Sequence, residues 1–214
     1  MSIKKKFPEA LFERIADNLS MQDFAVVEDV FSDIEQETLR QELFQQYEHG
    51  TFKAAGIGNK KGYQQNTTVR GDHIHWVERD NTSSQCHFFF DLMDALSEYL
   101  NRTCYLGIRS RELHFAMYPP GAFYKRHLDV FQNTKARKIS VVCYLNKDWQ
   151  EKEGGQLRLY IPTDDGLEKT IELLPFGGRL VCFRSDLLEH EVLPATRERL
   201  TITGWLKNEN NFPI

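Results

Sequence analysis

The chain has 214 residues, which is enough to bury a full hydrophobic core. Hydrophobic residues make up 41% and charged residues 27%, so the composition excludes a disordered tail, a fibre and a disulfide-stapled mini-protein. The formal net charge of −4 gives no reason to expect nucleic acid as a ligand. No apolar stretch reaches the roughly 18 residues that span a bilayer, so we expect no membrane partner.

The cysteines and the N-terminus indicate a cellular compartment. The four cysteines show neither CxxC nor zinc-finger spacing. The basic start of the chain is followed by charged residues, whereas a secretory signal would continue with an apolar segment. We therefore expect free, mostly buried thiols in a cytoplasmic protein.

The first part of the chain has mainly helical patterns. Apolar residues recur at helical spacing over residues 8–19 and again over residues 85–100. Ser32 and Glu35 match a capping box that opens another helix, and Phe24–Val27 is a short apolar strand. These patterns predict a helical N-terminal support over about residues 1–100.

A long polar connection separates two of these helices. Residues 50–66 contain several glycines beside two consecutive lysines. Connections of this length are usually binding loops or lids. We therefore predict a lid over this segment.

The second half of the chain alternates apolar and polar residues in short runs, which is typical of strands. The predicted strands cover residues 113–117, 139–145, 157–161, 167–174, 179–183 and 200–206. Many short strands with glycine, proline and aspartate between them predict a mainly β fold, namely a jelly-roll (double-stranded β-helix) of about residues 103–207. With its helical support, it would form one domain over residues 1–214.

Two histidines and a carboxylate form the candidate metal site. His127 and Asp129 are two residues apart, and on a strand such residues point to the same face. His190 lies next to a predicted strand end and can add a second imidazole. Two histidines and one carboxylate can occupy one face of octahedral Fe(II) and leave three positions open. The alternative is a surface histidine beside a solvated aspartate.

Arg199 is the candidate anion-binding residue, because it opens the last predicted strand and a guanidinium grips a carboxylate through two parallel hydrogen bonds. Such a charge-assisted bond contributes about 1.5–3 kcal/mol. Arg197 has the same strand parity and is a competing candidate, and a surface salt bridge is the alternative role for Arg199. His73 and His75 also share strand parity and form the alternative metal site.

The sequence resembles the 2-oxoglutarate and Fe(II)-dependent oxygenases, specifically the hypoxia-type prolyl hydroxylase domain branch and its bacterial relatives. The resemblance covers roughly residues 20–207. The segments that carry it are Arg70–Trp76, Met117–Pro119, Tyr124–Asp129, Tyr144–Trp149, Gly154–Arg158 and His190–Trp205. Together these segments are highly specific for the family.

The resemblance implies a role for each residue of the candidate site. It implies that His127, Asp129 and His190 bind Fe(II). It implies that Arg199, assisted by Tyr144, binds the distal carboxylate of the co-substrate 2-oxoglutarate.

Further roles follow from the same resemblance. It implies that Tyr118 lies near the co-substrate and the metal and that Trp205 walls the pocket, although aromatic residues seen alone are more often core. The segment that ends in Arg70 and Asp72 would close over the substrate. Asp72 would be fixed by a salt bridge to Arg137.

The implied activity is hydroxylation with Fe(II), 2-oxoglutarate and dioxygen, with ascorbate as a candidate reductant. We expect a monomeric prolyl 4-hydroxylase that acts on a protein substrate, with elongation factor Tu as the first candidate, and oxygen sensing is a candidate role. One alternative is a hydroxylase of a free amino acid or another small molecule. A second alternative, from another class, is a non-catalytic metal-binding jelly-roll that serves as an interaction module.

Overall fold

The computed structural model describes residues 4–56, 66, 68–130 and 136–209. Within these ranges the helical elements are α1 (Glu9–Gln22), α2 (Asp33–Glu48), α3 (His87–Cys104) and the 3-10 turns η1 (Ser84–Cys86) and η2 (Glu151–Glu153). The predicted capping box is present, since the Ser32 hydroxyl accepts from the Glu35 amide while the Glu35 carboxylate accepts from the Ser32 amide. None of the helices in the described ranges has the length and apolar character needed to span a bilayer.

The strands form two antiparallel sheets. The larger sheet has the order β1-β9-β6-β11-β4-β3-β2, and the smaller sheet has the order β5-β10-β7-β8. The strand bounds are β1 (Phe24–Val27), β2 (Lys53–Ala54), β3 (His73–Trp76), β4 (Ser110–Tyr118), β5 (Tyr124–His127), β6 (Arg137–Tyr144), β7 (Leu157–Pro162), β8 (Glu168–Leu173), β9 (Leu180–Arg184), β10 (Glu189–Val192) and β11 (Arg199–Lys207).

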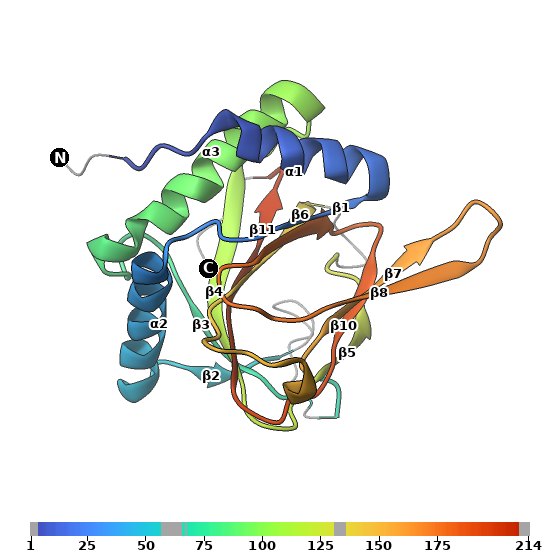
Figure 1. The fold of residues 1–214 in the computed structure, drawn as a ribbon. Helices are drawn as coiled ribbons and strands as arrows, with labels where there is room; N and C mark the ends of the chain where they lie inside the picture. Colours follow the sequence, from blue (N-terminus) through green and yellow to red (C-terminus); the bar gives the residue numbers. More distant parts are fainter. Residues whose placement is uncertain (1–3, 57–65, 67, 131–135, 210–214) are drawn as a thin grey trace.

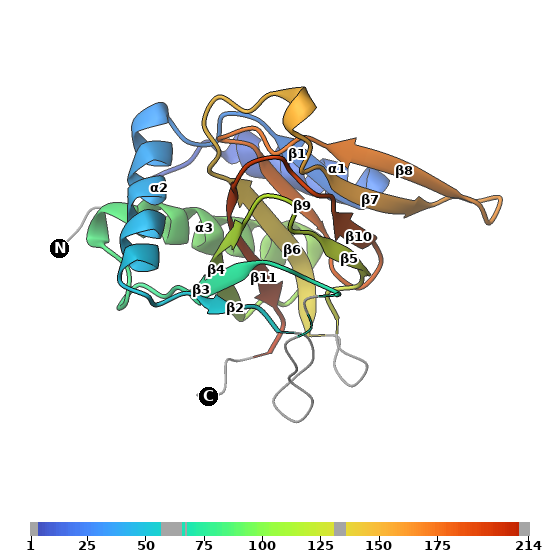
Figure 2. The same ribbon diagram turned by 90° about the horizontal axis from the view of Figure 1, so that it is seen from below.

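The elements form three layers (Figure 1, Figure 2). The helices cover one face of the larger sheet, and the smaller sheet lies over its other face. Side chains along β11 alternate between the two faces of the larger sheet. On one face, the core that includes residues of the three helices contains Leu200, Ile202 and Leu206. On the opposite face, Arg199 and Trp205 line a pocket. The mainly β jelly-roll with buttressing N-terminal helices is therefore confirmed.

The structure differs from the predicted elements at three places. The predicted lid over residues 50–66 contains β2, which pairs with β3, and residues 57–65 lie outside the described residues. β5 ends at His127, so the assumption that Asp129 shares its strand is wrong. His190 lies within β10, where we expected a position beside a strand end.

Candidate active site

A pocket lies between the two sheets, since residues of both sheets line it. Its walls carry the candidate metal ligands, the candidate anion-binding arginine and several aromatic rings. The lining residues are Arg70, His114, Tyr118, Tyr124, His127, Asp129, Val142, Leu157, Phe183, His190, Val192, Arg199, Thr203 and Trp205. The fold therefore brings together in one pocket the three candidate metal ligands, Arg199, Tyr118 and Trp205, which the sequence analysis had singled out.

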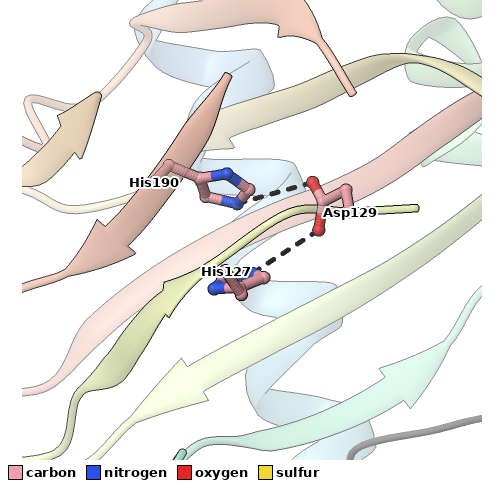
Figure 3. A group of neighbouring side chains, drawn as sticks. All are labelled: His127, Asp129 and His190. Atoms are coloured by element: carbon pink, nitrogen blue, oxygen red, sulfur yellow. Dashed lines mark ion pairs between the residues drawn. The ribbon is translucent and has the colours of Figure 1, made fainter. Parts of the chain in front are cut away.

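The two histidines and the aspartate converge on one point of the pocket (Figure 3). His127 Nε2 lies 3.5 Å from Asp129 Oδ1, and His190 Nε2 lies 3.5 Å from Asp129 Oδ2. One ligand atom from each residue lies within 4.8 Å of the others, and no other such group of His, Cys, Asp and Glu exists among the described residues. β5 and β10 create this arrangement, because His127 and His190 are direct partners in their antiparallel register.

Both imidazoles present the same nitrogen to the centre. The Nδ1 atoms lie 2.7 Å and 3.3 Å from the backbone carbonyl oxygens of Lys125 and Leu188. A carbonyl only accepts, so Nδ1 carries the proton in each ring and Nε2 offers its lone pair. This is the tautomer that a metal-binding histidine needs.

The protonation states also suit metal binding. Burial lowers the pKa of His190 to about 4, so the ring is neutral near pH 7. Burial on its own would raise the pKa of the Asp129 carboxyl, but the positive charges around it, namely His190 and His127 when protonated and Arg137, outweigh burial and hold this pKa below its usual range. The centre therefore offers two imidazoles and one carboxylate, a donor set that fits a divalent transition metal.

Contacts from β6 hold Asp129 beyond the end of β5. Ser140 Oγ lies 2.6 Å from Asp129 Oδ2, and Arg137 Nη1 donates to the Asp129 carbonyl at 3.1 Å. Ser140 Oγ in turn lies 2.8 Å from Ser185 Oγ. Long-range contacts of this kind give no local signal in the sequence.

Arg199 lines the pocket and is buried. Its Nε donates to the Gly155 carbonyl at 2.9 Å, and its guanidinium carbon lies 5.1 Å and 5.0 Å from the ring centroids of Tyr118 and Tyr144. No carboxylate among the described residues forms an ion pair with it, and the buried Tyr144 hydroxyl has no hydrogen-bond partner in the same part of the chain. A buried cation beside an unused hydroxyl fits an anionic ligand, because a charge buried without a partner is costly.

The competing candidates lie elsewhere. Arg197 is 43% exposed and pairs with Glu153 at 3.4 Å, so it does not face the pocket. The ring of His75 stacks on Phe52, and neither His73 nor His75 belongs to the metal-ligating group.

Gly155 packs against Arg199, and the residue analysis did not single it out. Its φ is +72°, and an added Cβ would lie 3.0 Å from Ala195 Cβ, 3.1 Å from Trp149 Cζ2 and 3.3 Å from Arg199 Cδ. Only glycine adopts this conformation easily and admits the arginine so closely. The consecutive glycines Gly154 and Gly155 were the available signal.

The expected salt bridge between Asp72 and Arg137 is not formed among the described residues. Asp72 instead accepts from Arg70, whose Nε and Nη2 lie 2.7 Å and 2.5 Å from its two carboxylate oxygens. Arg137 pairs with Glu112 at 2.9 Å, and its guanidinium carbon lies 3.4 Å from the Trp205 ring centroid. Arg70 is closer to Asp72 along the chain, and Arg137 has its own acidic partner across the sheet.

Tyr124 is a second residue that sequence reasoning missed. Its ring stacks on His127 with a centroid distance of 3.6 Å and an interplanar angle of 16°, and Arg70 covers its other side at 4.2 Å. Strict alternation places residues three apart on opposite faces. The pairing shifts register here, because His127 and Tyr124 face His190 and Val192, which are only two apart, so both rings share one face.

Comparisons with known proteins agree with this geometry. Residues 113–207 match the family model described as the 2OG-Fe(II) oxygenase superfamily. Human Egl nine homolog 1 is 29% identical over 202 residues, which cover 90% of this chain but only 46% of that protein, so the chain spans about half the length of this curated relative.

Two solved structures are similar over nearly the whole chain. A Pseudomonas putida prolyl-4-hydroxylase is 35% identical with a TM-score of 0.82, and the match covers 93% of this chain and 100% of that one. A Trichoplax adhaerens prolyl hydroxylase in complex with a hypoxia inducible factor peptide fragment is 28% identical with a TM-score of 0.81, covering 94% of this chain and 90% of that one. These similarities confirm the resemblance.

Proposed function

The chain belongs to the 2OG-Fe(II) oxygenase superfamily, among relatives of the prolyl hydroxylase type, and on that premise we propose that it is an Fe(II)- and 2-oxoglutarate-dependent prolyl 4-hydroxylase of a protein substrate. The observation that carries the proposal is the pairing of two features in one pocket. One is a group of two histidines and an aspartate suited to a divalent ion, and the other is a buried arginine without an acidic partner among the described residues.

Each residue of the site then has a defined task. His127, Asp129 and His190 hold the Fe(II) ion, which together with 2-oxoglutarate supplies the oxidation of a C–H bond by dioxygen. Arg199 binds the distal carboxylate of 2-oxoglutarate, and the Tyr144 hydroxyl donates its unused proton to the same group. These tasks require the co-substrate to enter with one end at Arg199 and the other at the metal.

The remaining pocket residues exclude water and limit the mouth. Tyr118 packs beside Arg199, and Trp205 is held by Arg137 against the side of the pocket. Arg70 and Asp72 form a nearly buried ion pair over Tyr124, with side chains that are 10% and 0% exposed. We propose that this pair closes the substrate side of the pocket. The Arg70 N–H groups that bond to Asp72 are then used within the chain and are not available to bind the substrate.

A protein substrate is supported by the relatives. The Trichoplax structure is a complex with a peptide fragment, and the Pseudomonas protein is named as a prolyl-4-hydroxylase. We propose elongation factor Tu as the first substrate to test. The cytoplasmic location, the monomeric state, the use of ascorbate and oxygen sensing stay predictions.

The experiment that tests the proposal is incubation with Fe(II), 2-oxoglutarate and dioxygen, first with elongation factor Tu and then with a proteome digest. We expect succinate and a proline that has gained one oxygen atom, detected by mass spectrometry, and neither product with His127→Ala. Succinate formed with free amino acids but not with peptides would replace the protein-substrate proposal with the small-molecule one. No succinate with any substrate would indicate a non-catalytic module and refute the enzyme assignment.

A further inference from the structure

Asp129 is the metal-site residue that is not itself part of a strand. β5 ends at His127, and residues 131–135 lie outside the described residues. Neither imidazole makes a short hydrogen bond to its carboxylate, because each Nε2 lies 3.5 Å from an Asp129 oxygen. The position of the carboxylate must therefore come from contacts with the larger sheet.

Ser140 on β6 supplies that contact together with Ser185, which follows β9. The two side chains are 1% and 0% exposed, and their hydroxyl oxygens lie 2.8 Å apart. The distance of 2.6 Å between Ser140 Oγ and Asp129 Oδ2 is typical of a charge-assisted bond from a hydroxyl to a carboxylate. The backbone of Ser185 is itself fixed, since its amide donates to the Lys138 carbonyl at 3.1 Å.

The direction of both hydrogen bonds can be assigned. An ionised carboxylate only accepts, so the single proton of the Ser140 hydroxyl points to Asp129. Ser140 then has only its oxygen left for Ser185, and Ser185 must be the donor between the two serines. The chain of two bonds therefore ends on Oδ2 and has one orientation.

We propose that Ser140, oriented by Ser185, is a positioning residue that fixes the Asp129 carboxylate for metal binding. The inference rests on the proposed function, because it concerns the same metal site. Hydrogen-bond partners of metal ligands typically contribute 10- to 100-fold to metal affinity. Ser140 contributes at that level, and Ser185 contributes less because Ser140 can keep its bond to Asp129 without it.

The test is a calorimetric titration of the metal-free protein with Mn(II), an ion that the same donor set binds and that dioxygen does not consume during the measurement. We expect Ser140→Ala to weaken Mn(II) binding about 10- to 100-fold. Ser140→Thr keeps the hydroxyl and restores affinity near that of the parent, which a purely structural role would not explain. Ser185→Ala gives a smaller loss in the same direction.

Ser97→Ala is the matched control, because Ser97 in α3 donates to the Met93 carbonyl of its own helix. Unchanged Mn(II) affinity in Ser140→Ala, or an equal loss in Ser97→Ala, would overturn the inference. Circular dichroism checks the fold of each variant, and if Ser140→Ala does not fold, Ser185→Ala decides by the direction of its effect. If the parent protein does not bind Mn(II), the proposed function itself is refuted. If the parent binds Mn(II) and the serine variants bind it equally well, only the positioning role of Ser140 is refuted.

Discussion

Replacing Arg199 with methionine separates the binding role of the guanidinium from its role in stability. The side chain is buried, donates through Nε to Gly155 and has no acidic partner among the described residues. Methionine is unbranched and adaptable and can fill much of the same space. We therefore expect Arg199→Met to weaken 2-oxoglutarate binding without losing folding stability.

Both magnitudes follow from the contacts. Losing a charge-assisted bond of about 1.5–3 kcal/mol weakens 2-oxoglutarate binding about 10- to 160-fold. In the ligand-free protein the variant loses one hydrogen bond and two ring contacts of about 1 kcal/mol each. Against these losses stands the desolvation of a buried cation, which costs several kcal/mol. The free energy of unfolding should therefore be at least as high in the variant as in the parent.

The assay combines urea unfolding of the ligand-free proteins with calorimetric titration of 2-oxoglutarate into their Mn(II) complexes. Arg197→Met is the matched control, because it removes an exposed guanidinium that pairs with Glu153, and its 2-oxoglutarate affinity should equal that of the parent. Retained affinity in Arg199→Met would refute the binding role. A loss of about 3–5 kcal/mol of stability would refute the view that the guanidinium is buried without an anion, since that is the cost of breaking a buried ion pair.

Three further predictions concern glycine, metal and pH. Gly155→Ala should weaken 2-oxoglutarate binding, because the added methyl group displaces the Arg199 side chain. Gly166→Ala is the control: Gly166 has φ +78° and nothing lies within 4 Å of its added Cβ, so this variant should reduce only stability. Equal 2-oxoglutarate affinities in the two variants would contradict this. Chelation of the metal with EDTA should lower the melting temperature of the parent but not that of His127→Ala; an EDTA effect in His127→Ala would place the metal elsewhere. Burial lowers the pKa of His190 to about 4 and that of His114 to about 3, below the unfolded value of 6.5. Both rings stabilise the ligand-free fold above pH 6.5, and each loses about 2 kcal/mol of that stability by pH 5. Urea unfolding of His114→Leu between pH 7 and pH 5 should show a shallower loss than the parent, and an identical slope would contradict the assignment.

The parts of the site that the sequence predicts are those encoded by residue type and strand parity. Arg199 and Trp205 alternate correctly along one long strand, and the histidines and aspartate are the residue types that a metal requires. The strand positions of Asp129 and His190 were wrong, because a few polar residues at strand ends do not fix where pairing begins or stops.

The residues that were missed depend on contacts between distant segments. Ser140 and Ser185 are ordinary strand and turn residues until β6 and β9 pair and bring their hydroxyls together. Tyr124 reaches the face of His127 only through a register shift against β10, which simple alternation does not reveal. The partner of Asp72 was mistaken because the resemblance supplied Arg137, while Arg70 has the better geometry in this chain.

The register of β11 is unbroken with β4 and runs without a shift from Thr201 to Leu206 against β6. This has a consequence for how the site can change over evolutionary time. Arg199 faces Tyr118 at one end of the ladder, and Trp205 faces Ser140 nearer the other, so one strand sets the spacing between the two ends of the pocket. Inserting or deleting a single residue between them would turn one end away from the cavity. Sequence changes in the surrounding loops can therefore reshape the opening of the pocket and alter which substrates enter it. The length of the proposed co-substrate that fits inside the pocket stays constant.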